Sequence, residues 1–311
     1  MELYRSFATW LRQEYGERVQ KISINLPFSC PNKDGNKGTG GCVYCDNQSF
    51  LPDYTLESKT VIEQLKEGIQ YFKKKYPTQR YIAYFQNYTN TYAPTEKLFQ
   101  LFSEAMSFPE VIAISVSTRP DCLSDKVISL LSELNKIKRV FVEIGIESTY
   151  DTTLTTINRC HTYSDVVKAI SRLNNVKILV SGHLIFGLPG ETIADAIVHA
   201  QQLSLLPLHS IKIHQLQILK DTPLHRLYMK NNAFVTPLSL HEHINWCIHF
   251  LEHLSPNIYI ERFTSESPKE KVIAPNWNQI KNYQVVELIK KELKQKKLIK
   301  GKNTFRIIDD I

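Results

Sequence analysis

Short runs of apolar and β-branched residues recur along the first two thirds of the chain, and longer segments with helical spacing separate them. The predicted strands lie at residues 19–25, 80–86, 111–117, 139–146, 176–186 and 210–218. Examples of the predicted helices between them lie at 58–76, 123–134, 162–173 and 192–206. Nearly continuous apolar strands that alternate with helices are typical of a parallel sheet covered by helices on one or both faces.

Six such strand–helix units predict either an incomplete β/α barrel or a doubly wound α/β sheet. In both folds the functional residues follow the carboxyl ends of the strands. Polar clusters occur at these points of the sequence. They read QNYTNTY after the second predicted strand, STRPD after the third, ES after the fourth and GLPGE after the fifth. The sequence therefore predicts a site at that end of the sheet.

The last quarter of the chain has a different pattern. A predicted helix at 238–254, a predicted strand at 257–263 and a lysine-rich helix follow one another, with no low-complexity linker before them. We therefore predict two regions. Residues 1–235 form the core barrel with an N-terminal helix, and residues 236–311 form a small C-terminal α/β extension packed on the core.

Composition and charge limit the classes of protein to which this chain can belong. The 311 residues are 42% hydrophobic and 22% charged, as in ordinary globular proteins. The sequence has neither a run of about 20 apolar residues, which a membrane helix needs, nor a signal peptide, so we expect a soluble cytoplasmic protein without a membrane partner. The net charge of +7 is compatible with an RNA or nucleotide partner without establishing one.

Three of the six cysteines lie together, in a glycine-rich segment directly after the first predicted strand. The segment contains Cys30, Cys42 and Cys45, with eleven residues between the first two and two between the last two. Thiolates suit zinc and iron–sulfur clusters. A structural zinc ion or a complete cubane takes four protein ligands, so three cysteines would leave one iron open to a substrate or cofactor.

Two other interpretations of these cysteines stay open at this point. The first is that they are incidental thiols in a loop, although free cysteines usually occupy apolar cores. The second is a zinc site that a distant histidine or cysteine completes. The remaining cysteines are scattered along the chain, at Cys122, Cys160 and Cys247.

The cysteine segment and several later motifs resemble one known family. The segment CPNKDG…GTGGCVYC is followed by YFQNYTNTYAP, STRPDCL, EIGIES, INRCHTYSD, GHLIFGLPGET, IKIHQLQILKDTPL and ERFTSESPKEKVIAPNWN. Together they resemble radical S-adenosylmethionine (SAM) proteins of the YhcC/YtqA type, which are related to the elongator catalytic subunit. The resemblance spans roughly residues 3–300 and implies an incomplete (β/α)6 radical SAM barrel.

The resemblance also implies the cofactors and the type of reaction. In such proteins three cysteines bind a [4Fe–4S] cluster, here Cys30, Cys42 and Cys45, and SAM chelates the remaining iron. One electron, from a reductant such as flavodoxin or ferredoxin, cleaves SAM to a 5′-deoxyadenosyl radical that abstracts hydrogen from a substrate. The cofactor carries this chemistry, and the protein supplies position and excludes water.

Several residues match positions at which relatives contact SAM. Tyr44 corresponds to the adenine contact, and Arg159 to an arginine that pairs with the SAM carboxylate. Ser117 and Glu147 correspond to contacts of the amine or the ribose hydroxyls, and His183 to a further polar contact. Thr89, Asn90 and Thr91 replace the usual glycine-rich motif for the methionyl amine. Core packing of Tyr44 or His183 and a surface salt bridge of Arg159 are the alternatives.

Substrate contacts are predicted on the sixth strand. His214, Gln215 and Gln217 alternate there, so His214 should face opposite to the two glutamines, and polar groups that face the barrel interior suggest substrate contact. Residues 281–302 contain eight lysines and two glutamates, a pattern that could contact phosphates or form an ordinary solvated helix.

These features favour a radical SAM enzyme that acts on tRNA. The resemblance suggests modification of a wobble-uridine side chain, with removal of a carboxymethyl group from carboxymethylaminomethyluridine to give aminomethyluridine. One alternative is a radical SAM enzyme that acts on a small molecule or a protein side chain. Another is a non-catalytic, metal-stabilised RNA-binding module.

Overall fold

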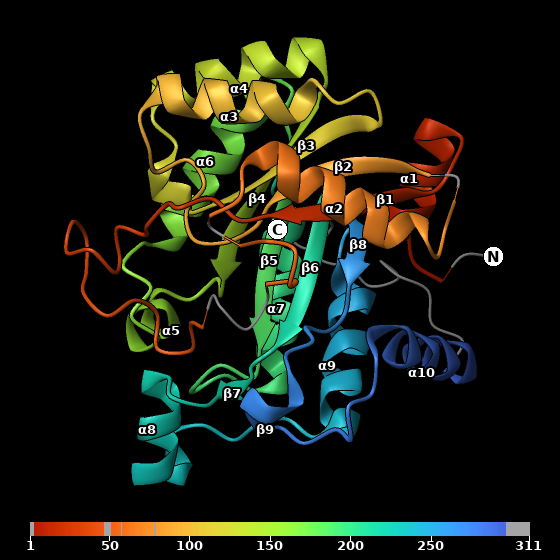
Figure 1. Cartoon of the computed structure of the whole chain (residues 1–311). Helices are drawn as coiled ribbons and strands as arrows, with labels where there is room; N and C mark the ends of the chain where they lie inside the picture. The colour runs from red at the N-terminus through yellow and green to blue at the C-terminus, as the bar shows by residue number, and fades with distance from the viewer. Residues whose placement is uncertain (1–2, 47–50, 57, 78, 297–311) are drawn as a thin grey trace, which may run out of the picture.

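A single parallel sheet organises the chain. The structure is a computed structural model and describes residues 3–46, 51–56, 58–77 and 79–296. Its seven-stranded sheet has the order β1-β2-β3-β4-β5-β6-β8, and every neighbouring pair is parallel. The strands are β1 (Val19–Ile24), β2 (Arg80–Phe85), β3 (Val111–Thr118), β4 (Arg139–Glu147), β5 (Leu179–Phe186), β6 (Ser210–Gln215) and β8 (Tyr259–Arg262). The strongly twisted sheet curls into an open half-barrel (Figure 1).

Helices connect successive strands and cover the outer face of the sheet (Figure 1). They are α1 (Phe7–Tyr15), α2 (Val61–Lys73), α3 (Thr95–Met106), α4 (Asp125–Ile137), α5 (Asp151–Thr156), α6 (Tyr163–Asn175), α7 (Ile193–Ser204), α8 (Pro223–Lys230), α9 (Leu240–His253) and α10 (Asn282–Gln295). Polar caps fix several helix starts. Thr60 and Thr162, for example, each form a capping box with the acidic residue three positions later.

The predicted incomplete β/α barrel is confirmed, and the six predicted core strands are β1 to β6. The predicted strand of the C-terminal extension is β8, which adds a seventh strand to the same sheet by pairing with β6. The predicted helix at 238–254 is α9, and the lysine-rich segment contains α10. Positions 297–302 of that segment lie outside the described residues.

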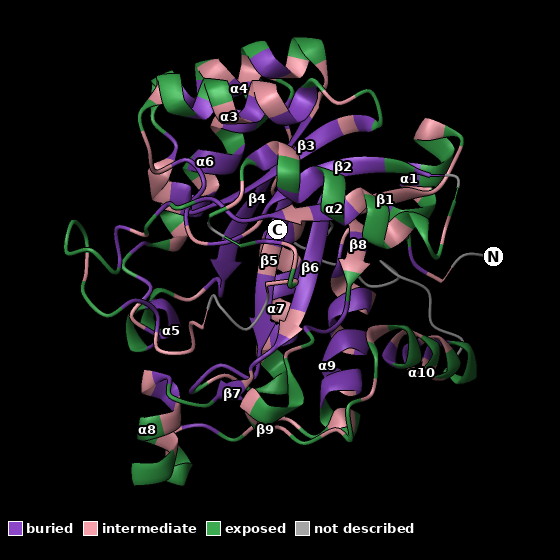
Figure 2. Ribbon diagram, in the orientation of Figure 1, coloured by how far each residue is buried: buried purple, intermediate pink, exposed green. Residues whose placement is uncertain are grey.

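The core lies between the sheet and its outer helices, and the inner strands β2 to β6 are buried almost throughout, whereas the edge strands β1 and β8 are only partly buried (Figure 2). A second, antiparallel sheet of β7 (Ile218–Leu219) and β9 (Val272–Ala274) lies with α8 beyond the carboxyl ends of β5 and β6 (Figure 1). None of the helices in the described part of the chain has the length and apolar character that spanning a bilayer requires.

The two edge strands, β1 and β8, face each other across the open side of the half-barrel. Among the described residues, no ladder of backbone hydrogen bonds joins them. Instead, Lys21 of β1 forms an ion pair of 2.8 Å with Glu261 of β8. Helix α1 contacts both strands, and the segment before it forms a parallel bridge between Ser6 and Ile260. Side chains and α1 therefore close the side that backbone pairing leaves open.

Candidate functional site

A cavity of about 730 Å³ occupies the interior of the half-barrel, and residues that follow the carboxyl ends of several strands line it. This volume is in the range of sites that enclose a small molecule. Cys30, Cys42 and Cys45 all line it. The loop that carries them is a chain of tight turns, in which the amide of Lys33 donates to the carbonyl of Cys30 (2.7 Å) and that of Cys45 to Cys42 (3.0 Å). The sequence segment thus brings three thiols to one cavity.

The segment after α5 holds the cysteine loop in place. The Asn158 side chain donates to the carbonyl of Gly41 (2.8 Å), and the Asn32 side chain donates in return to the carbonyl of Asn158 (2.6 Å). Gly38 packs so closely on Asn32 that a Cβ atom there would lie 2.2 Å from the Asn32 Oδ1. Sequence reasoning missed both asparagines, because the pairing of two distant loops leaves no local signal.

Polar donors surround the buried Cys42. Its Sγ accepts from Nη1 of Arg159 (3.5 Å) and from the amide of Asn32 (3.6 Å). A guanidinium group and an amide therefore lie beside a sulfur that could serve as a metal ligand. Burial, with smaller contributions from Cys42 and Cys30, raises the pKa of the Cys45 thiol to about 12, although Lys33 and Arg159 act in the opposite direction.

Cys30, Cys42 and Cys45 are among the residues that line the cavity. Within residues 3–46, 51–56, 58–77 and 79–296, no three His, Cys, Asp or Glu side chains lie close enough together to hold a single metal ion. The binding of a cluster by these three cysteines stays a prediction.

Arg159 and Glu147 lie side by side at the cavity wall next to Cys42. They form an ion pair of 3.2 Å, and Nη2 of Arg159 also donates to the carbonyl of Gly145 (3.1 Å). A Cβ atom at position 145 would lie 2.2 Å from Nη2, so this close approach needs glycine. The buried Nε of Arg159 has no hydrogen-bond partner within the described residues. A donor is therefore available beside the thiols.

The other predicted SAM contacts divide into two groups. Tyr44, Thr89, Ser117 and His183 line the cavity, and the buried hydroxyl of Thr89 has no hydrogen-bond partner in the described part of the chain. Asn90 and Thr91 are not among the lining residues. The amide of Asn90 donates to backbone carbonyls of Phe85, Asn87 and Ser117, and Thr91 donates to that of Cys122. These two side chains support the loop, and their contact with SAM stays a prediction.

All three predicted substrate residues are among those that line the same cavity, and their contact with the substrate stays a prediction. Strand β6 ends at Gln215, so Gln217 lies beyond the part of the chain to which strand alternation applies. The amide of Gln215 exchanges two hydrogen bonds with the backbone of Ser265, and Gln217 accepts one from the hydroxyl of Ser267. The glutamines thus anchor the segment after β8.

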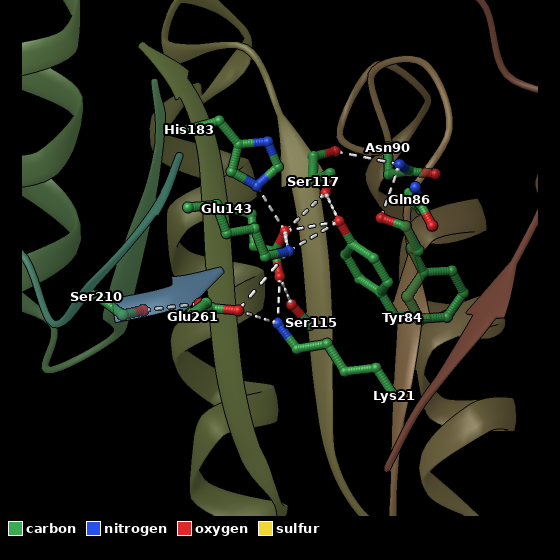
Figure 3. Close-up of polar contacts among 12 residues, drawn as sticks. Lys21, Tyr84, Gln86, Asn90, Ser115, Ser117, Glu143, His183, Ser210 and Glu261 are labelled. Atoms are coloured by element: carbon green, nitrogen blue, oxygen red, sulfur yellow. Dashed lines mark hydrogen bonds and ion pairs between the residues drawn. The ribbon is translucent and has the colours of Figure 1, made fainter. Parts of the chain in front are cut away.

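A network of polar side chains fills the interior of the half-barrel (Figure 3). Its centre is Glu143 on β4, whose side chain is completely buried. The carboxylate accepts hydrogen bonds from Lys21 (2.6 Å), Tyr84 (2.7 Å), Ser115 (2.8 Å) and His183 (2.8 Å), and it also pairs with Lys212. Glu261 pairs with the same two lysines. Each of the seven strands contributes at least one member.

This interior is unusual for a β/α barrel, which is normally filled by branched apolar side chains. Most members of the network line the cavity, namely Lys21, Tyr84, Ser117, Glu143, His183, Lys212 and Glu261. Buried charges are costly unless they are paired and hydrogen-bonded, as they are here. The network therefore forms part of the cavity wall, which we call the polar floor.

The network predicts a loss of stability in acid. Although burial raises the pKa of Glu261, Lys21 and Lys212 outweigh it and lower that pKa from 4.5 to about 2. A carboxylate with a lowered folded-state pKa stabilises the fold above its unfolded-state pKa and ceases to do so as the pH falls through the folded-state value. The free energy of unfolding of the cluster-free protein, measured in urea at a series of pH values, should decline between pH 4.5 and pH 2. A constant value over this interval would contradict the pairing.

Comparison with known proteins assigns the chain to a family. A sequence model described as the radical SAM superfamily matches residues 33–203, and one described as the radical SAM C-terminal domain matches residues 208–295. The chain belongs to the radical SAM superfamily. Radical SAM proteins bind a [4Fe–4S] cluster and SAM, which are therefore the cofactors of this enzyme.

Individual relatives agree with the predicted resemblance. The chain is similar to YtqA of Bacillus subtilis, with 33% identity over 96% of this chain and 92% of YtqA. It is also similar to YhcC of Escherichia coli, with 30% identity over 92% and 91%. A stretch of 82 residues is 35% identical to a tRNA uridine(34) acetyltransferase of Methanocaldococcus infernus and covers 26% of this chain and 15% of that protein.

The fold is shared with a solved protein structure. The structure of Elp3 from Methanocaldococcus infernus matches with a TM-score of 0.69 and 18% identity. The match covers 91% of this chain and 64% of the Elp3 chain, so the radical SAM protein described here spans less than two thirds of that structure.

The residues present fit both radical SAM cofactors. Three thiols face one cavity whose size suits a small molecule, and the cationic Arg159 lies beside them. The unpartnered Nε of Arg159 and the hydroxyl of Thr89 are buried donors in the part of the chain that the structure describes. Buried polar groups are normally hydrogen-bonded, so a ligand that accepts from these two is expected. Cys30, Cys42 and Cys45 would hold the cluster, and Arg159 and Thr89 would face SAM.

Proposed function

We propose that this radical SAM enzyme modifies the wobble uridine of tRNA in the cytoplasm, removing the carboxymethyl group from carboxymethylaminomethyluridine to leave aminomethyluridine. The observation that carries the proposal is the cavity itself, which runs from the three cysteines to a floor of paired charges. Such a space accepts a polar side chain of a nucleoside more readily than an apolar group.

The similarity to other proteins supports a tRNA substrate. One relative is named for its action on uridine 34 of tRNA, and the fold resembles that of Elp3 over most of this chain. The net charge of +7 favours binding to a polyanion. The external electron donor is proposed to be a reductant such as flavodoxin or ferredoxin.

The roles of this chain's own residues follow from their positions. When bound, the cluster and SAM supply the 5′-deoxyadenosyl radical that abstracts hydrogen from the substrate. Cys30, Cys42 and Cys45 would bind the cluster, Arg159 and Glu147 would orient SAM at the rim, and Tyr44 would pack against its adenine. The buried walls exclude water, which protects a reactive intermediate from side reactions.

The nucleosides of a deletion strain test this function. Deletion of the gene should cause the carboxymethylaminomethyl form of the wobble uridine to accumulate in tRNA at the expense of the aminomethyl form. Mass spectrometry of digested tRNA measures both nucleosides. Complementation with the wild-type gene should restore the ratio, and complementation with Cys42→Ala should not. An unchanged nucleoside profile would remove tRNA as the substrate and favour a small molecule or a protein side chain.

A further inference from the structure

One cationic side chain that lines the cavity has no carboxylate partner among the described residues. Glu143 and Glu261 share the two lysines of the network, and Glu266, which also lines the cavity, pairs with Lys281 (3.2 Å). Arg262 follows Glu261 on β8, lines the cavity and is exposed. Within the described residues no carboxylate lies in ion-pair contact with Arg262. Its guanidinium group is therefore free to bind an anionic ligand in the cavity.

His214 lies in the same region and has a free polar atom. It follows Lys212 by two residues on β6, so both side chains point to the same side of the strand. Its ring lies 5.6 Å from that of His183, measured between centroids. The Nε2 atom of His214 is buried and has no hydrogen-bond partner in the described part of the chain. Buried polar groups without partners are rare in folded proteins and often mark the place of a ligand.

The electrostatic surroundings of His214 are positive. Burial lowers the pKa of His214 well below 6.5, and the neighbouring His183 lowers it further. Arg262 and Lys212 act in the same direction, whereas Glu143 opposes them. The ring is therefore neutral at pH 7 and can donate one N–H group, in a place where an anion is favoured.

We propose that His214 and Arg262 form a subsite in the cavity that binds the carboxylate of the substrate side chain. This inference rests on the proposed function, in which the group that is removed carries that carboxylate. Arg262 would supply a charge-assisted hydrogen bond and His214 a neutral one, so both an ion pair and a directed contact would distinguish the acid from an uncharged analogue.

Lys21 and Lys212 are less suitable for this role. Their ammonium groups already bind Glu143 and Glu261, and a carboxylate that displaced them would leave buried negative charges unpaired. The side chains of His214 and Arg262 form no such ion pairs among the described residues. Replacing them breaks no hydrogen bond or ion pair of their side chains among the described residues, so the variants should fold.

Binding of two RNA probes tests the subsite. The probes are anticodon stem–loops that carry either carboxymethylaminomethyluridine or its methyl ester at the wobble position, so that their phosphates are identical and only the carboxylate charge differs. Cluster-reconstituted enzyme with SAM and without reductant cannot turn over, and fluorescence anisotropy then reports affinity. Wild type should prefer the acid by about tenfold or more, as expected for hydrogen bonds to a charged group. The double variant His214→Leu/Arg262→Gln should prefer it by less than about twofold.

Control measurements separate the possible outcomes. Arg12→Gln removes a positive charge from the exposed face of α1 and should keep the wild-type preference. If the double variant also keeps that preference while the wild type converts the acid, the subsite is overturned and the proposed function stands. A matching loss of SAM affinity in the double variant would assign the two residues to the cofactor and likewise overturn the subsite. If the wild type neither prefers nor converts the acid, the proposed function fails, and the inference fails with it.

Discussion

Replacing Cys42 with alanine should reduce the release of 5′-deoxyadenosine to the background of a reaction without enzyme. Cys42 is the most enclosed of the three cavity cysteines, and Arg159 and Asn32 both donate to its sulfur. Loss of a hydrogen-bonded neighbour of a metal ligand costs about 10- to 100-fold in affinity or activity, so loss of a ligand should cost more than about 100-fold. Anaerobic reconstitution, reduction with SAM and chromatography of the products measure this loss.

Cys160→Ala is the matched control for this variant. Cys160 is exposed, directly follows Arg159 and is not among the residues that line the cavity. Its removal should leave the iron content and the yield of 5′-deoxyadenosine close to those of the wild type. A Cys42→Ala protein that retains both the full iron content and the product yield would show that the cysteine loop is not the cluster site.

Glu143→Leu should destabilise the fold by about 3–5 kcal/mol, the usual cost of removing one partner from a buried ion pair. The variant leaves Lys21 and Lys212 with Glu261 as their remaining carboxylate partner, and it also removes hydrogen bonds from Tyr84 and His183. The free energy of unfolding in urea, compared with that of the wild type at the same cluster loading, measures the effect.

An exposed ion pair provides the comparison. Glu287 pairs with Lys290 three residues later on α10, where both side chains are largely solvated. Glu287→Ala should therefore change the free energy of unfolding by less than about 1 kcal/mol. A loss of similar size in the Glu143 and Glu287 variants would mean that the barrel interior is much more hydrated than its packing indicates.

The strand pattern predicted the part of the site that lies at the ends of the strands. Apolar runs located β1 to β6, and the rule that function follows the carboxyl ends of parallel strands pointed to Cys30, Glu147 and Thr89. That rule needs only the order of the elements. It does not need the curvature of the sheet, which explains its success from sequence alone.

The polar floor could not be predicted in the same way. Glu143 and Lys212 lie in the middle of apolar strands, where an isolated charge gives no indication of its partner. The ion pairs depend on the sheet curling until β1, β4, β6 and β8 face one another, and strand periodicity does not specify that curl. Likewise, the position of Asn90 in a motif predicts a SAM contact, whereas its side chain donates to carbonyl groups of β2, of its own loop and of β3.

The ion pair between Lys21 and Glu261 has a mechanical consequence. In a closed barrel, the continuous hydrogen-bonded ladder fixes the number of strands, their tilt and the diameter together. Here the two edges are joined by the tips of two side chains and by the packing of α1. The segment before α1 adds one backbone hydrogen bond to β8, from the amide of Ile260 to the carbonyl of Arg5 (2.9 Å). The width of this half-barrel therefore depends on side-chain contacts and on the docking of α1, whereas the width of a closed barrel depends on its backbone ladder.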